Sequence, residues 1–253
     1  MLLKDRLARQ GNALFRWRSF LPLALIPLVL VALPQSGALE RIFGHAAESA
    51  WDYFAALLAF LGLAVRVATV GFAPAGTSGR NVHAQRADAL NTTGLYSVVR
   101  NPLYLGNLTI LVALALETMV WWIAPLVAVA GLLYYERIVY AEEAFLAEKY
   151  GAAYSDWATV TPAFIPDFSR WRSPALPFCW RTALRREYHG LLVVVGGLTA
   201  IELLTDLVGE GETLTDWLAA ESGWIYFFVV GALLYAGLRA IRKLTPWLAA
   251  PNR

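Results

Sequence analysis

Apolar runs alternate with polar segments along the chain, and they predict a series of membrane-spanning helices. The continuous apolar runs fall at about 19–34, 51–72, 103–139, 190–208 and 223–241. The run at 103–139 is too long for one crossing, because at 1.5 Å per residue it would extend about 55 Å against a hydrocarbon core of about 30 Å. It therefore predicts two helices that form a hairpin. The turn is expected near Glu117, Thr118, Trp121, Trp122 and Pro125.

These runs predict an all-α, polytopic integral membrane protein with about six transmembrane helices. The composition agrees, since 58% of the 253 residues are hydrophobic, 16% are charged and the mean hydropathy is +0.51. A soluble domain averages about 45–50% apolar and about 25% charged residues. The single cysteine, Cys179, excludes an internal disulfide framework. The three histidines are scattered along the chain, so no metal site is expected.

The placement of the charges orients the predicted helices. The loops at about 35–50 and 209–222 hold one basic residue between them, Arg41, whereas nearly all other Lys and Arg lie in the remaining segments or near helix ends. Cytoplasmic loops of membrane proteins carry an excess of Lys and Arg. Both termini are therefore expected in the cytoplasm, as in a multi-pass protein of a bacterial inner membrane. The acidic residues of the second outward loop fit this orientation, and Glu117 is expected to be a water-facing cap at the far turn.

Residues 94–106, GLYSVVRNPLYLG, stand at the cytoplasmic entrance of the hairpin. The hairpin should bring this motif back beside Glu142 and Glu143, at about 8–10 Å between helix axes. Pro102 suits the first turn of a helix, and the free N–H groups of that turn together with Arg100 favour a carboxylate or phosphate. The two glutamates point about 100° apart on a helix, so one could accept ribose hydroxyls while the other pairs with Arg100 or orients an amine.

Each of these signals also has an ordinary structural interpretation. An arginine at a cytoplasmic helix start is usually a topology anchor, interfacial tyrosines usually belong to an aromatic belt, and a Glu-Glu pair at a helix end is usually solvated. Their convergence through the hairpin favours a ligand site. The expected ligand has an anionic end, a ribose and a positive centre.

The two-part motif resembles the isoprenylcysteine carboxyl methyltransferase superfamily, which includes phospholipid methyltransferases. The first part, G-x-Y-x-x-x-R-x-P-x-Y-x-G, is matched by Gly94, Tyr96, Arg100, Pro102, Tyr104 and Gly106. The second part is matched by Glu142, Glu143, Leu146, Tyr150, Gly151, Tyr154, Pro162, Ile165 and Pro166. The family usually has His where this chain has Asn101. Asn can donate and accept hydrogen bonds but cannot titrate near neutral pH.

The resemblance implies an S-adenosylmethionine-dependent methyltransferase with a lipophilic acceptor that enters from the bilayer. It implies catalytic roles for Arg100 and Asn101. The implied cofactor-binding residues are Gly94, Tyr96, Arg100, Pro102, Tyr104, Gly106, Glu142, Glu143 and Tyr154. The chain then divides into an N-terminal helix and outer loop (1–49), a methyltransferase-like core (50–166), a basic juxtamembrane connector (167–189) and a C-terminal hairpin with its tail (190–253).

The acceptor is not specified by the motif. Prenylated cysteine, a phospholipid amine, a lipid phosphate and a small thiol all stay open, and anionic acceptors gain some weight because Asn101 is not a base. The segment just before the motif offers candidate headgroup ligands, which are Arg80, Asn81, His83 and Gln85. Membrane lipids are expected partners, and nucleic acid is not. The alternatives are an NADPH-dependent, sterol-reductase-like enzyme and a non-catalytic lipid-binding protein on the same scaffold.

Overall fold

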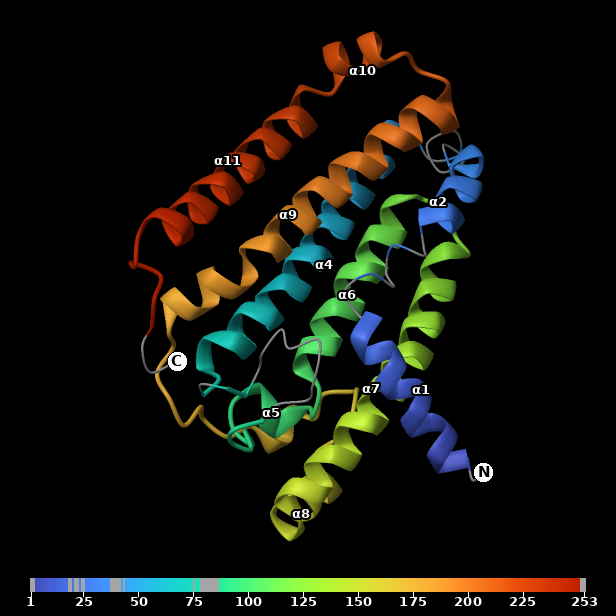
Figure 1. Cartoon of the computed structure of the whole chain (residues 1–253). Coiled ribbons are helices and arrows are strands. Elements are labelled where there is room, and N and C mark those ends of the chain that lie inside the picture. The colour runs from blue at the N-terminus through green and yellow to red at the C-terminus, as the bar shows by residue number, and fades with distance from the viewer. Residues whose placement is uncertain are drawn as a thin grey trace.

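The computed structural model describes residues 3–17, 20, 23, 26–36, 42, 44–74, 76–77 and 87–250. These described residues are mainly helical and form no strand, which confirms the predicted all-α class (Figure 1). The helices are α1 (Leu3–Trp17), α2 (Ile26–Ala32), α4 (His45–Phe72), α5 (Leu95–Val98), α6 (Pro102–Glu117), α7 (Ile123–Tyr150), α8 (Ala152–Val160), α9 (Trp180–Leu204), α10 (Leu214–Ala220) and α11 (Ser222–Leu244). Two short 3₁₀ turns cover Leu33–Gln35 and Phe168–Arg170, and a π-helical turn, Thr205–Glu210, extends α9.

Four helices of the described part are long and apolar enough to cross a membrane. They are Ala46–Phe72, Ile123–Tyr150, Trp180–Glu210 and Ser222–Leu244. Two shorter apolar helices, Ile26–Gln35 and Pro102–Glu117, coincide with predicted spans. The sixteen residues of α6 extend about 24 Å, which is less than a hydrocarbon core of about 30 Å. The membrane class is therefore supported, and a count of six spans stays a prediction.

Helices α6 and α7 form the predicted hairpin, with residues 118–122 as the turn between them. Val120 and Ile123 are buried at this turn and pack with Ala115, Val127 and Ala32 of α2. Glu117, expected to face water, is instead fully buried. The expectation was wrong because α4 and α9 cover the end of α6, which the apolar pattern of 103–139 could not reveal. The hairpin places residues 94–106 and the end of α7 at the same end of the molecule (Figure 1).

The core at mid-height is formed by α4, α6 and α9. Its buried side chains come from all three helices and are Ala59, Leu63, Ile110, Ala113, Val194 and Leu198. Helices α4 and α6 cross so closely that a Cβ on Gly62 would lie 2.7 Å from the carbonyl oxygen of Gly106. Small residues allow such close approach between membrane helices, where van der Waals packing drives association.

Helix α9 begins at Trp180, inside the segment predicted as a connector. The charged residues at 181–187 interrupt the apolar run and delay its apparent start to residue 190. One of these charges, Glu187, is buried and forms a salt bridge with Arg66 of α4. A buried charge is tolerated in a helix when a partner neutralises it. Helix α9 therefore belongs to the packed body of the protein.

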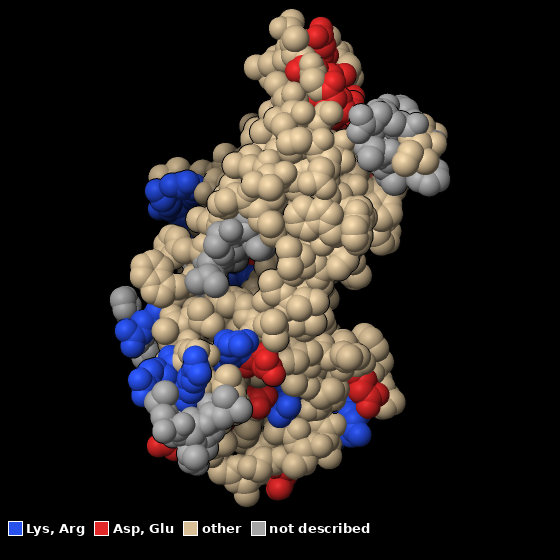
Figure 2. Space-filling model, turned by 90° about the vertical axis from the view of Figure 1, so that its right-hand side faces the viewer, with Lys and Arg blue, Asp and Glu red and all other residues tan. Residues whose placement is uncertain are grey.

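Basic side chains are concentrated in one half of the molecule, whereas acidic side chains lie in both halves (Figure 2). Figure 2 shows Asp and Glu at the end where α10 lies, and most of the visible Lys and Arg in the other half. The acidic end includes the segment 209–222 that was predicted to face outward. This distribution agrees with the orientation expected from the positive-inside rule, and the cytoplasmic location of the termini stays a prediction.

The close crossing of α4 and α6 predicts that an alanine in place of Gly62 lowers stability, whereas an alanine in place of a glycine away from the crossing does not. Gly62→Ala should destabilise the protein by about 1–3 kcal/mol, because its Cβ would press on the backbone of α6. Gly237→Ala in α11 is the matched control, since a Cβ there meets nothing within 4 Å. The control should be neutral or more stable by about 0.5–1 kcal/mol, owing to the better helix propensity of alanine. Thermal unfolding of the purified variants in detergent measures both, and equal melting temperatures would contradict the close crossing.

Candidate functional site

The two halves of the sequence motif are joined by backbone hydrogen bonds and by one hydrogen bond from a side chain. The N–H of Arg100 donates to the carbonyl of Pro162 at 2.8 Å, and the side-chain amide of Asn101 donates to the carbonyl of Ala163 at 3.1 Å. The N–H of Asp167 donates to the carbonyl of Val98 at 2.9 Å. The segment after α8 is therefore fixed against the segment that leads into α6.

Glycine and proline shape the first half of the motif. Gly94 has a positive φ of 60°, precedes α5, and donates its N–H to the carbonyl of Arg172 at 2.9 Å. Pro102 begins α6 as predicted, with Asn101 at the N-cap. A Cβ on Gly106 would lie 2.7 Å from the Cγ of Arg66, so Gly106 allows close contact with α4. The structure thus explains Gly94, Pro102 and Gly106 through backbone geometry and helix packing, and their predicted contact with a cofactor is untested.

The hairpin brings the two glutamates against the motif, each with a different partner. Arg100 Nη1 lies 3.2 Å from Glu143 Oε1. The Tyr104 hydroxyl donates to Glu142 Oε1 at 2.8 Å, and the Tyr104 ring stacks on Tyr135 with 4.9 Å between centroids. The side chains of Glu142 and Glu143 are therefore not equivalent, as their helical spacing predicts.

The pair between Arg100 and Glu143 leaves hydrogen-bonding capacity unused. Arg100 Nε and Glu143 Oε1 are both buried and have no hydrogen-bond partner, so the contact of 3.2 Å is an ion pair without hydrogen-bond geometry. A buried polar atom without a partner costs about 1–3 kcal/mol. One buried donor and one buried acceptor at the same place fit a ligand that carries both an anionic group and hydroxyl or amine groups.

Two tyrosines of the predicted site are held as neutral phenols. Burial raises the pKa of Tyr154 to about 12, with the charge of Glu143 adding to the effect and that of Arg100 opposing it. Burial also raises the pKa of Tyr96, and the charge of Glu142 adds to it. Trp157 links the two, since its ring meets Tyr154 edge-on at 5.6 Å and its indole N–H donates to the carbonyl of Tyr96 at 3.2 Å. Both phenols therefore remain possible hydrogen-bond donors at neutral pH.

A second ion pair lies behind the motif. Arg66 forms a two-point contact with Glu187, Nε to Oε2 at 2.7 Å and Nη2 to Oε1 at 2.9 Å, and its third nitrogen donates to the side chain of Asn107. This network ties α4, α6 and α9 together next to Gly106. The sequence offered one signal for it, an arginine within an apolar run, because ionisable residues inside membrane helices are costly and pair with one another.

A cavity of about 780 Å³ opens near the motif, between α5, α8 and residues 169–172. Its lining includes Leu90, Ser97, Trp157, Thr161 and Arg172. Arg100, Glu142 and Glu143 do not line it. The predicted headgroup residues Arg80, Asn81, His83 and Gln85 lie outside the described residues.

Residues 51–153 match the model of the phospholipid methyltransferase family, PEMT. The matched range contains the first half of the motif, the whole hairpin, and both Glu142 and Glu143. The resemblance seen in the sequence is thereby confirmed over this range. The residues of the α9–α11 region lie outside it.

Two curated relatives share a similar level of identity with the chain. One is the nickel-cobalt-cadmium resistance protein NccN of Alcaligenes xylosoxydans xylosoxydans, 35% identical over 154 residues, which are 59% of this chain and 64% of the relative. The other is the cobalt-zinc-cadmium resistance protein CzcN of Cupriavidus metallidurans, 35% identical over 136 residues, which are 52% of this chain and 59% of the relative. The matches thus span less than two thirds of either relative. No solved structure matches the chain.

Proposed function

Because residues 51–153 match the model of the phospholipid methyltransferase family, which belongs to the isoprenylcysteine carboxyl methyltransferase superfamily, we propose that the chain transfers a methyl group from S-adenosylmethionine to a lipophilic acceptor in the membrane. The observation that carries the proposal is the half-buried pair of Arg100 and Glu143, in which one buried donor atom and one buried acceptor atom have no hydrogen-bond partner. It lies where the matched hairpin returns to the predicted cytoplasmic surface.

The charged residues at the base of the hairpin are suited to hold the methyl donor. The guanidinium of Arg100 can bind a carboxylate through two parallel hydrogen bonds, which a planar fork makes better than an ammonium group. Glu143, whose Oε1 has no hydrogen-bond partner, can accept hydrogen bonds from ribose hydroxyls or an amine. Glu142 is oriented by the hydroxyl of Tyr104. Tyr96 and Tyr154 can donate hydrogen bonds as neutral phenols.

The bound donor supplies an activated methyl group on a positively charged sulfur. The chain therefore has to align two reactants and exclude water, and alignment alone can contribute about 7–11 kcal/mol to the lowering of a barrier. The position of Asn101 bears on the acceptor, because its amide N–H₂ already donates to the carbonyl of Ala163 and the group cannot take up a proton. An acceptor that is already anionic, such as a carboxylate or phosphate, needs no base at neutral pH and is favoured.

Donor binding distinguishes this proposal from its two alternatives. A sterol-reductase-like enzyme should bind NADPH, and a non-catalytic lipid-binding protein should bind neither nucleotide. We expect the purified chain in detergent to bind S-adenosylmethionine and its demethylated product in a calorimetric titration, and not NADPH.

Substitutions at the hairpin base should weaken binding of the demethylated product unequally. Glu143→Gln should lose tenfold to hundredfold in affinity, because charge-assisted hydrogen bonds are worth about 1.5–3 kcal/mol. Glu142→Gln should lose less, since its carboxylate is engaged by Tyr104. Arg100→Lys should weaken binding markedly, because lysine cannot make the planar two-point contact.

Glu136→Gln is the matched control, since Glu136 is an exposed glutamate on the same helix. It should bind like the parent. If Glu143→Gln and Arg100→Lys also bind like the parent, with unchanged melting temperatures, the pair is a topology anchor and the donor site lies elsewhere.

We further propose that the methyl transfer serves resistance to divalent metal ions. The observation in favour is that both curated relatives are named as resistance proteins for cobalt and cadmium, together with nickel or zinc. A bacterial host that expresses the chain should tolerate more cobalt and cadmium than the empty host. The same host with equal amounts of Glu143→Gln should lose that gain. Equal tolerance of all three strains would contradict a role in resistance.

A further inference from the structure

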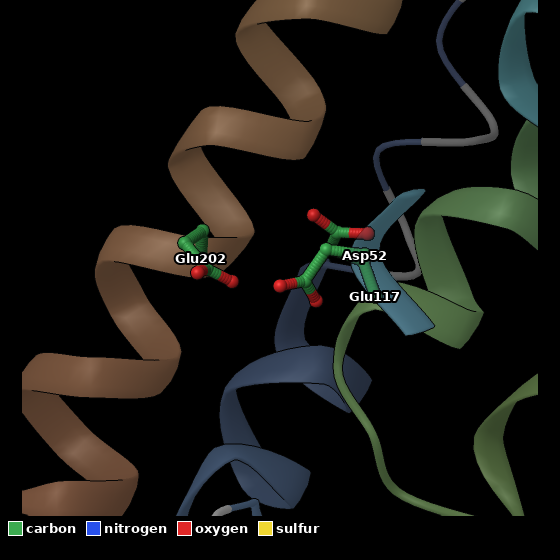
Figure 3. A group of neighbouring side chains, drawn as sticks. All are labelled: Asp52, Glu117 and Glu202. Atoms are coloured by element: carbon green, nitrogen blue, oxygen red, sulfur yellow. The ribbon is translucent and has the colours of Figure 1, made fainter. Parts of the chain in front are cut away.

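Three acidic side chains from three different helices meet at the far end of the core. Asp52 of α4, Glu117 at the end of α6 and Glu202 of α9 each place a carboxylate oxygen so that all three lie within 4.8 Å of one another. Figure 3 shows these side chains pointing into the space between their helices. The group lies beside the α6–α7 turn, at the opposite end of α6 from Arg100 (Figure 1).

Two members of the group are buried, and one of them, Glu117, has no hydrogen-bond partner among the described residues. Glu117 is fully buried, and neither of its carboxylate oxygens has a hydrogen-bond partner in the described structure. Glu202 is 7% exposed. The hydroxyl of Thr205, in the π-helical turn that follows Glu202, is also buried without a partner. A carboxyl group removed from water is either neutralised by a proton or, when ionised, paired with a positive charge.

Neighbouring residues fix this arrangement and add to its negative charge. The indole N–H of Trp51 donates to the carbonyl of Leu116 at 2.8 Å, which joins the positions next to Asp52 and Glu117. The carboxylates of Glu48 and Asp206 are also buried, and both lie close enough to act on the charge of Glu202.

The spacing of the oxygens is compatible with a single metal ion. Protons can also neutralise buried carboxylates, and the response to cations in the test below distinguishes the two cases. A hard divalent cation binds oxygens at about 2.0–2.6 Å, so two ligand atoms on opposite sides of it lie about 4–5 Å apart. All three carboxylate oxygens lie within 4.8 Å of one another, so one such ion can contact all of them. Water molecules can complete the shell.

We propose that Asp52, Glu117 and Glu202 form a binding site for a divalent cation of the oxygen-preferring class, such as Mg²⁺, Ca²⁺ or Mn²⁺. Carboxylate oxygens suit such ions, whereas softer metals gain from thiolate or imidazole ligands, which this group does not offer. The ion joins α4, α6 and α9 at the end opposite the proposed methyl-donor site. The inference does not depend on the proposed methyl transfer.

The test uses the purified full chain in detergent after treatment with a chelator. Titration with Mn²⁺, followed by the loss of the electron paramagnetic resonance signal of the free ion, should show one bound ion per chain. Addition of Mg²⁺, Ca²⁺ or Mn²⁺ should raise the melting temperature by roughly 5 °C when the ion is about 100-fold above its dissociation constant. Sodium at equal ionic strength should not.

Two variants and one control assign the site. Glu117→Gln should remove the Mn²⁺ binding and the melting shift, and without added cations it should be at least as stable as the parent, because a repulsive charge is gone. Glu202→Gln should behave in the same way and serves if Glu117→Gln does not fold. Glu210→Gln removes an exposed carboxylate at the same end and should leave both readouts unchanged.

A parent that binds no Mn²⁺ and gains no stability from any of the three ions would overturn the proposal. So would Mn²⁺ binding that survives in both Glu117→Gln and Glu202→Gln. A parent that loses stability as pH rises, without any response to cations, would show that protons hold the three carboxylates together and would equally reject the cation site.

Discussion

The antiparallel closure of α6 on α7 is the constraint on which the candidate site depends. It brings together segments that are about forty residues apart in the sequence. The guanidinium of Arg100 thereby contacts the carboxylate of Glu143, and the hydroxyl of Tyr104 donates to Glu142. The same closure forces the segment after α8 back onto the start of α6, where the backbone of Arg100 and the amide of Asn101 hold it. Without the turn at residues 118–122, none of these contacts could form. The turn and the site lie at opposite ends of one hairpin.

The membrane environment explains why the polar residues of the core come in groups. Lipid offers no water to a buried charge, so each ionisable side chain among the apolar helices requires a partner. Arg66 and Glu187 form an ion pair behind the motif and connect α9 to α4. At the other end, Glu117 is buried and has no hydrogen-bond partner among the described residues, which is why the acidic group points to a cation from outside the protein. The Arg66 network and the acidic group of Asp52, Glu117 and Glu202 thus lie between α9, α4 and α6 at two levels along the helices.

The apolar pattern was sufficient to predict the helix class and the hairpin, because both follow from run length and from the turn residues near Glu117. The predicted hairpin also placed Arg100 close to Glu142 and Glu143, as the structure has them. The apolar pattern could not predict where α9 begins, since the charges at 181–187 hide an amphipathic helix whose buried charge is neutralised by a distant residue. It could not predict the acidic group either, because Asp52, Glu117 and Glu202 are far apart in the sequence and show no ligand spacing. Glu117 looked like a solvated cap for the same reason.

Transfer of a labelled methyl group tests the central claim most directly. The purified chain in lipid vesicles made from a bacterial membrane extract would be incubated with S-adenosylmethionine that carries a labelled methyl group. The account predicts label in the fraction soluble in organic solvent, at a rate at least tenfold above that of Glu143→Gln. Label no greater than in vesicles without protein, from a chain that retains its melting temperature, would contradict the account.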